Sequence, residues 1–449
     1  MKTEGVATLL GDPKKAIIKL SIPMIVAMLV NSLYNVVDTF WIAGLGADHL
    51  AAIGFVFPLF IIMIAIANGI GTGGGAAISR FIGAKNKKNA DNAAEHTLLF
   101  MILISVAFTG LLYTFAEQII SSMGSGTTTL LAVQYARIIF LGTIFMTFSF
   151  VGNAILRSEG NVKKAMIAML LGTVLNLILD PIFIYTLDLG IAGAAWATVI
   201  SMAVVSLILF YWLFLKNNIY LSFDFKNFKF SKELTKDIFK VGLPASFQNF
   251  SMALMMVAIN FIIVGIATTD GVAVFSTGWR IATIAIMPIF GVATAVISVS
   301  AAAYGSKNYA KLKIAFLYAI KLCFMLELII AAVLFLFAPF VAGIFTYSDN
   351  TVRIAADLII FFKLIGLFYP AAAIASISSA MFQGVGKGLN ALIITFLRSI
   401  VFIIPAVWLL SRQYGLVGVW WGIVIGTILG SIVAIIWANQ YITKLIQKS

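Results

Sequence analysis

The stretch KLSIPMIVAMLVNSLYNVVDTFWIAGLG, residues 19–46, decides the class of fold. It contains an apolar run long enough to cross a bilayer as one helix, since a spanning helix needs about 20 residues. Inside that run lies one carboxylate, Asp38, and near its start lies Pro23. An acid at membrane depth is costly unless it faces a wet cavity or a partner. The stretch therefore predicts a membrane-spanning helix that carries a candidate functional residue.

The rest of the chain repeats this apolar pattern. Of 449 residues, 62% are hydrophobic and only 10% are charged, which is too few charges for the surface of a soluble enzyme of this size. The composition therefore predicts an all-α integral membrane protein with twelve transmembrane helices. Cutting the chain where charges, Gly and Pro cluster places the spans at residues 16–44, 51–79, 98–116, 129–156, 165–187, 191–215, 238–266, 272–303, 314–337, 354–382, 389–410 and 416–440.

Three short motifs recur at nearly constant spacing and indicate an internal repeat. KLSIP at 19–23 matches KVGLP at 240–244, GAKN at 83–86 matches GSKN at 305–308, and LGIAGAAW at 189–196 matches YGLVGVWW at 414–421, with offsets of 221, 222 and 225 residues. Each half holds an even number of spans, so the two halves insert the same way round and are related by a pseudo-twofold axis along the membrane normal. We expect two six-helix bundles arranged as a V around a central cleft, which is a transporter architecture.

The domain boundaries follow from the longest polar connection, which lies near the middle of the chain. We expect an N-terminal six-helix lobe at residues 1–215, a cytoplasmic linker at 216–237 and a C-terminal six-helix lobe at 238–449.

The positions of Lys and Arg predict the orientation. The N-terminus, the even-numbered connections and the C-terminus hold 23 of the 30 basic residues, whereas the odd-numbered connections hold only Arg353 and Arg412. By the positive-inside rule both termini are cytoplasmic, and we expect a multi-pass protein of the plasma membrane. The net charge of +13 is explained by this bias, so nucleic acid is not an expected partner.

The motifs together resemble the multidrug and toxic compound extrusion (MATE) family of transporters. The resemblance covers essentially the whole chain. It is carried by NSLYNVVDTFWIAGLG at 31–46, the Gly-rich GIGTGGGAAISRFIGAKN at 69–86, RSEGN at 157–161 and the LGIAGAAW element. Within the family the chain is similar to the DinF-like branch. The resemblance implies export of amphipathic, mostly cationic drugs or toxic organic cations in exchange for H⁺ or Na⁺.

Two acids inside the N-terminal spans can be argued for from the residues alone. Asn31, Tyr34, Asn35 and Asp38 follow helical spacing, as do Thr173, Asn176 and Asp180, so each acid ends a polar stripe on one helix face. Asp38 and Asp180 lie about 9 Å and about 10 Å from the outer ends of their helices, so they are level and predict one shared site. Two carboxylates in a low-dielectric cavity disfavour joint ionisation, which favours sharing a proton or a cation.

The other residues of the candidate site follow from the resemblance or from helix position. The resemblance adds Tyr135, Asn153 and Thr198 to the coupling network, although Asn153 counts to the inner end of its helix. We place Tyr135, Asn31, Asn35, Met255, Met256 and Gln248 at the substrate cavity, because flexible Met side chains repack around varied apolar ligands. Helix-to-helix packing is the alternative for each of them. Pro23 is a candidate hinge, although its counterpart Pro244 favours a shared kink.

No pattern indicates a cofactor or a metal centre. Cys323 is the single cysteine, and His49 and His96 lie in or beside expected loops. Na⁺ at Asp38, Asn176, Asp180 and Thr198 is the one ion site left open. We expect a monomer in the lipid bilayer.

Two other classes of function remain open. A flippase for lipid-linked saccharides shares the two-bundle plan, but it predicts several arginines for a pyrophosphate, and only Arg137 lies inside the N-terminal spans. A membrane-embedded enzyme would need a nucleophile, a metal or paired acids, and no His accompanies Asp38 and Asp180. We therefore expect a transporter rather than an enzyme.

Overall fold

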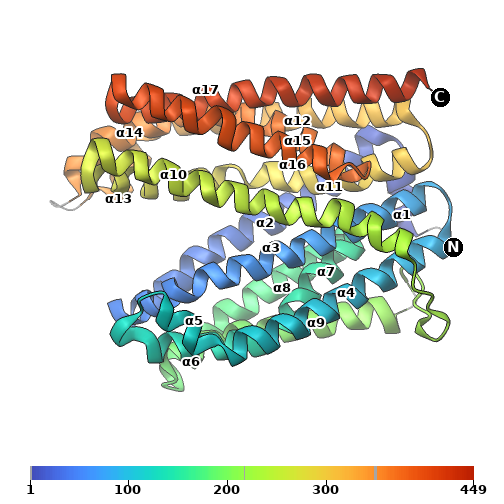
Figure 1. Ribbon diagram of the computed structural model, residues 1–449, viewed down its shortest axis with the longest axis horizontal. Coiled ribbons are helices and arrows are strands. Elements are labelled where there is room, and N and C mark those ends of the chain that lie inside the picture. The colour runs from blue at the N-terminus through green and yellow to red at the C-terminus, as the bar shows by residue number, and fades with distance from the viewer. Residues whose placement is uncertain (1–2, 217, 348–350, 449) are drawn as a thin grey trace. The chain divides into compact units, whose positions relative to one another are not determined.

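The computed structural model describes residues 3–216, 218–347 and 351–448, and within these ranges the chain forms helices and no strand (Figure 1). In the first half the elements are α1 (Glu4–Leu10), α2 (Pro13–Ala43), α3 (Ala47–Gly83), α4 (Lys87–Thr114), α5 (Ala116–Ser122), η1 (Gly126–Thr128), α6 (Thr129–Leu141), α7 (Thr143–Ser158), α8 (Val162–Pro181), η2 (Ile182–Thr186), α9 (Gly190–Phe210), η3 (Tyr211–Leu215) and η4 (Phe225–Asn227). The second half has α10 (Lys232–Ala285), α11 (Met287–Gly305), α12 (Tyr309–Leu336), α13 (Ala338–Phe345), η5 (Val352–Ile354), α14 (Ala355–Ile365), α15 (Phe368–Gly384), α16 (Gly388–Phe396), η6 (Leu397–Ile403) and α17 (Ile404–Gln447).

The helices of the described residues account for twelve membrane spans. Nine helical stretches are long and apolar enough to cross a bilayer, and two bent helix pairs, 126–158 and 352–384, raise the number to eleven. One of the nine runs for 60 residues, from Gly388 to Gln447, which at 1.5 Å per residue would be about 90 Å long. A hydrocarbon core of about 30 Å cannot contain it as one span. It breaks at Gly415, where α17 doubles back in Figure 1, and this break supplies the twelfth span.

The repeated motifs encode the same turns in both halves. In GAKN and GSKN the lysines, Lys85 and Lys307, both take a φ of 57°. The following asparagines cap the next helices, because Asn86 accepts from the Asn89 N–H at 3.1 Å and Asn308 from the Lys311 N–H at 2.9 Å. The third motif behaves alike: Gly190 and Gly415 have φ of 53° and 57°, a region that favours glycine, as the chain enters the next helix. The internal repeat is therefore a repeat of structure.

The chain divides into two compact units. The first unit is Met1–Leu10 with Val26–Ser246, and the second unit is Gly11–Ile25 with Phe247–Ser449. Each division falls shortly after a repeat proline, Pro23 in α2 and Pro244 in α10. The units therefore exchange the beginnings of these two helices, which differs from lobes that meet at a linker. The lobes at 1–215 and 238–449 remain a prediction.

Glycines pack against the first parts of α2 and α10, which the two units exchange. In the first unit α3 contacts α10 through Gly69 and Gly73. A Cβ on Gly73 would lie 2.2 Å from the Ile238 carbonyl oxygen, and one on Gly69 would lie 2.6 Å from that of Gly242. In the second unit Gly291, the repeat counterpart of Gly69, would bring a Cβ to 2.8 Å from the Ile25 nitrogen. The Gly-rich motif at 69–86 therefore has a packing role, because only glycine permits this backbone approach.

Each unit also has its own packed interior. In the first unit α3 packs against α4 and α7, and α9 packs against α6, α7 and α8. In the second unit α15 packs against α11, α12 and α17, and the rings of Phe275, Phe361 and Trp420 form one buried cluster.

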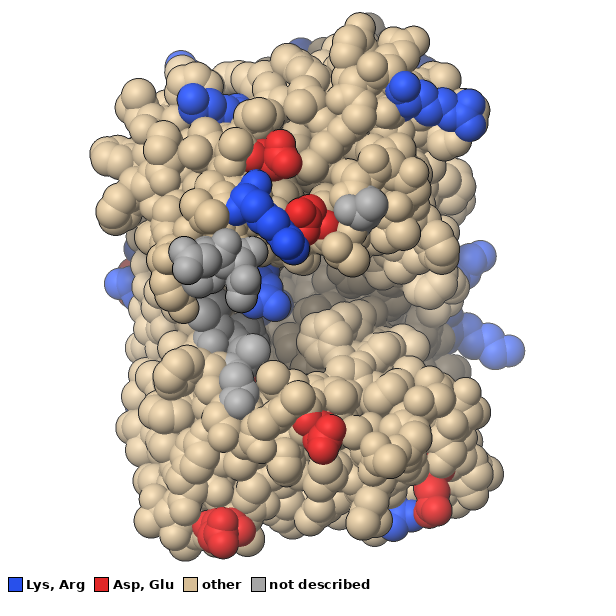
Figure 2. Space-filling model, turned by 90° about the vertical axis from the view of Figure 1, so that its left-hand side faces the viewer, with Lys and Arg blue, Asp and Glu red and all other residues tan. Residues whose placement is uncertain are grey.

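The end of the molecule at which α5 lies has few charges. Figure 2 shows that face, where isolated acidic and basic side chains stand in a largely uncharged surface. Two exposed ion pairs join helices: Arg137 on α6 to Glu117 on α5 at 3.7 Å in the first unit, and Arg353 on η5 to Asp270 on α10 at 2.8 Å in the second. Such exposed pairs contribute little stability.

Candidate functional site

Asp180 occupies a special position at the end of α8. It directly precedes Pro181, which has no backbone N–H, and the helix widens after it into the π-helix η2. Such π-segments often mark functional sites. The Asp180 side chain is fully buried, at 0% exposure. The sequence therefore places a carboxyl group inside the first unit at a point where the helix is irregular.

The hydrogen bonds of Asp180 leave it partly unsatisfied. Asn176, one turn earlier, donates through Nδ2 to Oδ1 at 3.0 Å. Oδ2 is buried and has no hydrogen-bond donor among the described side chains. A buried carboxylate oxygen without a donor is costly unless a proton or a cation is added.

Asp38 supplies the second carboxyl group from α2. It is half-buried, and its side chain interacts directly with that of Asp180. Two carboxyl groups can form a hydrogen bond only when one of them carries a proton. Tyr135 on α6 lies within electrostatic range of both acids. We call Asp38, Asp180, Asn176 and Tyr135 the paired-acid site.

Apolar and aromatic side chains hold this site in place. Ile42, Ile184 and Ala194 form a buried cluster against which Trp41 and Tyr135 pack. The Tyr185 hydroxyl donates to the Trp41 carbonyl at 2.5 Å, which ties η2 to the end of α2. The two helices that carry the acids are therefore fixed to each other.

The remaining candidates of the first unit lie on α2, α7 and α9. Asn153 is buried on α7 and donates to the Ser149 carbonyl at 2.8 Å. It lies about 8 Å from the end of α7 that precedes α8, whereas Asp180 lies about 27 Å along α8 from that connection. Thr198 is half-buried on α9, and Asn31 is half-buried on α2. Tyr34 and Asn35 lie on α2, but their side chains are outside the part that the structure describes.

The candidates in the second unit are engaged in packing. Gln248 on α10 accepts through Oε1 from Ser379 Oγ at 3.1 Å, Gln383 Nε2 at 3.2 Å and Thr395 Oγ1 at 3.4 Å. It therefore ties α10 to α15 and α16. Met255 is buried and Met256 is half-buried. Pro23 lies inside the continuous helix α2.

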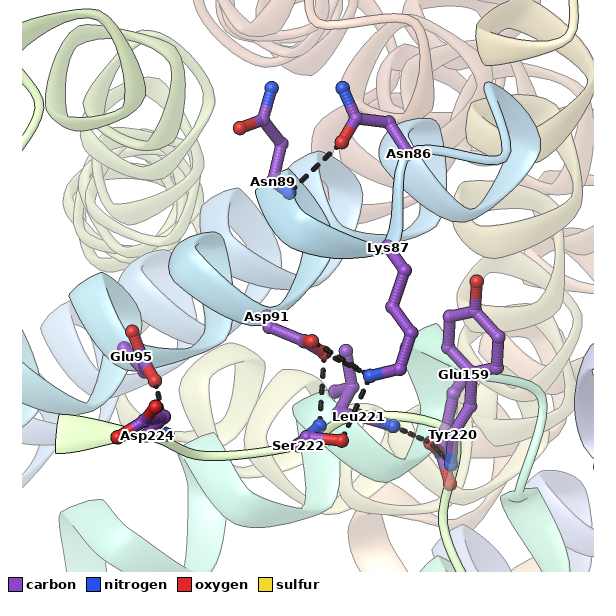
Figure 3. A network of polar contacts seen from close by, with 10 residues as sticks. All are labelled: Asn86, Lys87, Asn89, Asp91, Glu95, Glu159, Tyr220, Leu221, Ser222 and Asp224. Carbon is purple, nitrogen blue, oxygen red and sulfur yellow. Dashed lines mark hydrogen bonds and ion pairs between the residues drawn. The ribbon is translucent and has the colours of Figure 1, made fainter. Parts of the chain in front are cut away.

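A second cluster of acids holds the linker after α9. The backbone N–H groups of Tyr220, Ser222 and Asp224 donate to Glu159 Oε2 at 2.8 Å, Asp91 Oδ1 at 2.9 Å and Glu95 Oε1 at 2.7 Å (Figure 3). Alternate N–H groups point to one side of an extended chain, so three carboxyl groups can receive them in a row. We call these three acids and residues 220–224 the linker network.

Further polar groups complete the linker network. Lys87 donates to Asp91 Oδ2 at 2.7 Å and to Ser222 Oγ at 2.9 Å (Figure 3). The Ser231 N–H donates to His96 Nε2 at 2.9 Å. The linker network was not predicted from the sequence. The alternating sequence LSFDF at 221–225 is the signal that could have indicated an extended segment.

The described residues contain no group of three or more His, Cys, Asp or Glu side chains placed to hold a metal ion. The paired-acid site offers two carboxyl groups, and Asn176 turns its nitrogen rather than its oxygen toward Asp180. In this arrangement Asn176 serves a carboxylate and not a cation.

Comparisons with known proteins relate the chain to membrane transporters. A family model described as MatE matches residues 23–182 and 244–409. The chain is 27% identical over 424 residues to the multidrug export protein MepA of Staphylococcus aureus, a match that covers 94% of this chain and 92% of that protein.

Solved structures are more similar still. One, described as the outward-facing conformation of a multidrug resistance MATE family transporter of the MOP superfamily, is 44% identical with a TM-score of 0.97 and covers 100% of both chains. Another is a MOP superfamily transporter from Pyrococcus furiosus, 44% identical with a TM-score of 0.95, covering 99% of both chains. Its description says that the reverse polarity of its binding pocket suggests a different function.

Proposed function

The chain belongs to the MATE family of membrane transporters, and from this premise we propose that it exports drugs in exchange for H⁺ through the paired-acid site. It is a multi-pass multidrug efflux transporter and not an enzyme. The observation that carries the proposal is the direct interaction of two carboxyl groups, one of which is fully buried and has a single amide donor among the described side chains. Amphipathic, mostly cationic compounds are the proposed substrates.

The chemistry of the pair supports proton exchange. With both groups ionised, two negative charges face each other in an apolar surrounding, and Asp180 Oδ2 lacks a donor among the described residues. One proton relieves both costs, because it removes a charge and supplies the missing hydrogen bond. A cationic substrate nearby favours the fully ionised pair, so substrate binding and proton release are linked. Na⁺ could serve the same role, and we propose H⁺ because one proton supplies the donor that Asp180 Oδ2 lacks among the described side chains.

Alternating access is the proposed way in which this exchange drives export. The repeat and the two units provide two similar bodies, and we propose that one moves with respect to the other during transport. Pro23 lies on the helix that carries Asp38 and directly before the division between the units. Because proline removes one helical hydrogen bond, we propose Pro23 as the hinge of that helix. Thr198 and Asn153 remain proposed members of the coupling network, and Asn31, Met255 and Met256 remain proposed residues of the substrate cavity.

The orientation is also a proposal. We place both termini and the linker on the cytoplasmic side of the plasma membrane, because basic residues concentrate in those connections. Cys residues introduced at Asp48 and Asp270 should react with an impermeant thiol reagent in intact cells, and those at Lys85 and Lys232 should not. Labelling of Lys85→Cys from outside would reverse the orientation. We propose a monomer as the transporting form.

The flippase alternative finds no support at the paired-acid site. It requires arginines for a pyrophosphate, and Arg137 instead pairs with Glu117 at 3.7 Å, with 45% of the Arg137 side chain exposed. Its guanidinium also lies over the Tyr113 ring.

Transport into proteoliposomes tests the coupling. Uphill movement of ethidium is measured with a pH gradient in the absence of Na⁺, and with a Na⁺ gradient at fixed pH. We expect the pH gradient to drive it in the wild type and in Asp91→Asn, a matched acid-to-amide change in the linker network. Asp38→Asn and Asp180→Asn should abolish it, because the amide cannot cycle a proton. Full transport by the double variant under both gradients would show that the acids only hold helices together.

A further inference from the structure

A cavity lies at the opposite end of the first unit from the paired-acid site. Its volume is about 620 Å³, and its walls come from α4, α7, α9, η3 and the linker. Along α9 it begins at Ser206, about 24 Å from Gly190, the end of the helix that lies next to η2. This volume falls within the range of cavities that hold small organic molecules. We call it the linker cavity.

The walls of the linker cavity are aromatic. Six phenylalanines line it: Phe145, Phe148, Phe210, Phe214, Phe225 and Phe228. The ring of Phe214 packs against those of Phe210 at 4.7 Å and Phe225 at 6.0 Å, which joins the helix side to the linker side. Leu207 and Ile102, which are 65% and 48% exposed, also line it, so it opens to the surface of the first unit.

One charged side chain belongs to this wall. Glu95 lines the cavity and is 6% exposed. One of its oxygens accepts the Asp224 N–H at 2.7 Å, so the linker network fixes its position (Figure 3). Its charged or titratable neighbours are Asp91, Asp224 and His96, and His96 accepts the Ser231 N–H through Nε2. None of the described lining residues is Lys or Arg. Asp91 is itself paired with Lys87 at 2.7 Å, so Glu95 is the charge that the described lining supplies, and it favours a positive group.

We propose that the linker cavity binds amphipathic monovalent organic cations that enter from the adjacent membrane leaflet. The apolar body of such a compound fills the Phe-lined space, and its cationic group lies between aromatic faces and Glu95. The phosphate of a phospholipid would meet a carboxylate and no basic lining residue, which disfavours a lipid as the occupant. The inference rests on the proposed function, since it adds a first binding site for the same class of substrate.

Equilibrium binding without any gradient tests the linker cavity. Ethidium is titrated against the purified full-length chain in lipid nanodiscs, in the Asp38→Asn and Asp180→Asn background, which removes the paired acids. Glu95→Gln keeps an oxygen for the Asp224 N–H but loses the charge, and we expect Kd to rise about tenfold. Asp91→Asn is the matched control, because Asp91 also receives a linker N–H but does not line the cavity, and we expect less than about a twofold change.

Two further measurements keep the proposal falsifiable if Glu95→Gln folds poorly. Leu207→Trp narrows the mouth of the cavity at an exposed position and should also weaken ethidium binding. A neutral dye of similar size should bind more weakly to Leu207→Trp, but its affinity for Glu95→Gln should equal its affinity for the wild type. Equal effects of Glu95→Gln and Asp91→Asn would overturn the proposal, as would a co-purifying phospholipid lost only in Leu207→Trp with ethidium binding unchanged. If ethidium still binds at the linker cavity but neither a pH gradient nor a Na⁺ gradient drives export by the wild type, the proposed coupling would be refuted and the proposed cavity site would stand.

Discussion

Asp180 in the paired-acid site and Glu159 in the linker network are both buried carboxyl groups, at 0% and 1% exposure, but their partners differ. Glu159 receives two backbone N–H groups on Oε2, from Tyr220 at 2.8 Å and Leu221 at 3.4 Å, although its Oε1, like Asp180 Oδ2, has no donor among the described side chains. Asp180 receives one side-chain amide and faces another acid. Backbone donors cannot leave without unfolding a segment, whereas a proton or a substrate can come and go. Burial alone therefore does not identify a coupling acid, and the kind of partner does.

The largest expected effect is on export, which should depend on Asp180 and not on Glu159. Asp180→Asn should reduce uphill export to the level of empty liposomes, because the pair can no longer gain and lose a proton. Glu159→Gln should retain most of the export, since the amide oxygen still accepts the two linker N–H groups. The measurement is initial export rate at equal amounts of folded protein, verified by gel filtration. Equal loss in both variants would erase the distinction between the two regions.

The next effect concerns stability and its pH dependence. Burial raises the pKa of Glu159 from an ordinary value of 4.5 to about 7, despite its two backbone donors. A raised acid pKa contributes stability that is fully present below pH 4.5 and is lost as the pH rises through about 7. This difference corresponds to about 3 kcal/mol of unfolding free energy.

Glu159→Gln should remove this dependence. The melting temperature of the variant relative to the wild type should therefore be higher at pH 8 than at pH 5, measured by thermal unfolding in one detergent. Asp48→Asn, a change at an exposed acid, is the control and should show the same difference at both pH values. A pH-independent difference for Glu159→Gln would show that the carboxyl group stays ionised in the folded protein.

The smallest effect concerns the second unit. Gln248→Leu removes the acceptor of three side-chain hydrogen bonds, and we expect a loss of about 1 to 2 kcal/mol of stability. Ser379 and Thr395 can still donate to the Ala391 carbonyl, which limits the cost. The ratio of protons to drug should not change. A changed ratio would place Gln248 in the coupling or substrate machinery.

Much of the fold could be predicted from local sequence patterns. The apolar runs, GAKN and GSKN, and the matching Gly190 and Gly415 are local signals, and the helical fold and the family are confirmed. The exchanged helix beginnings could not be predicted, because Gly73 and Ile238 approach each other across 165 residues of chain. The π-helix after Asp180 could not be predicted either, since Pro181 indicates an irregularity in the helix but not its type.

Of the two sites, the paired-acid site could be predicted from the sequence and the linker network could not. Helical spacing was enough to propose Asp38 and Asp180 as one site, because each acid ends a polar stripe of helical spacing and the two lie at similar depth. The linker network depends on Glu159 meeting Tyr220, 61 residues later, through a backbone group that has no side-chain signature. Sequence patterns therefore reveal acids that lie on helix stripes and miss acids that bind an extended segment.

Proton release on drug binding is the most direct measure of the paired-acid site. Purified protein in weakly buffered detergent solution is mixed with ethidium, and the pH change is read with an indicator dye near neutral pH. We predict that the wild type and Asp91→Asn release about one proton per bound drug, since one proton is shared by two carboxyl groups. Asp38→Asn and Asp180→Asn should release none. Release that is unchanged in these two variants would contradict the central claim that this pair carries the coupling ion.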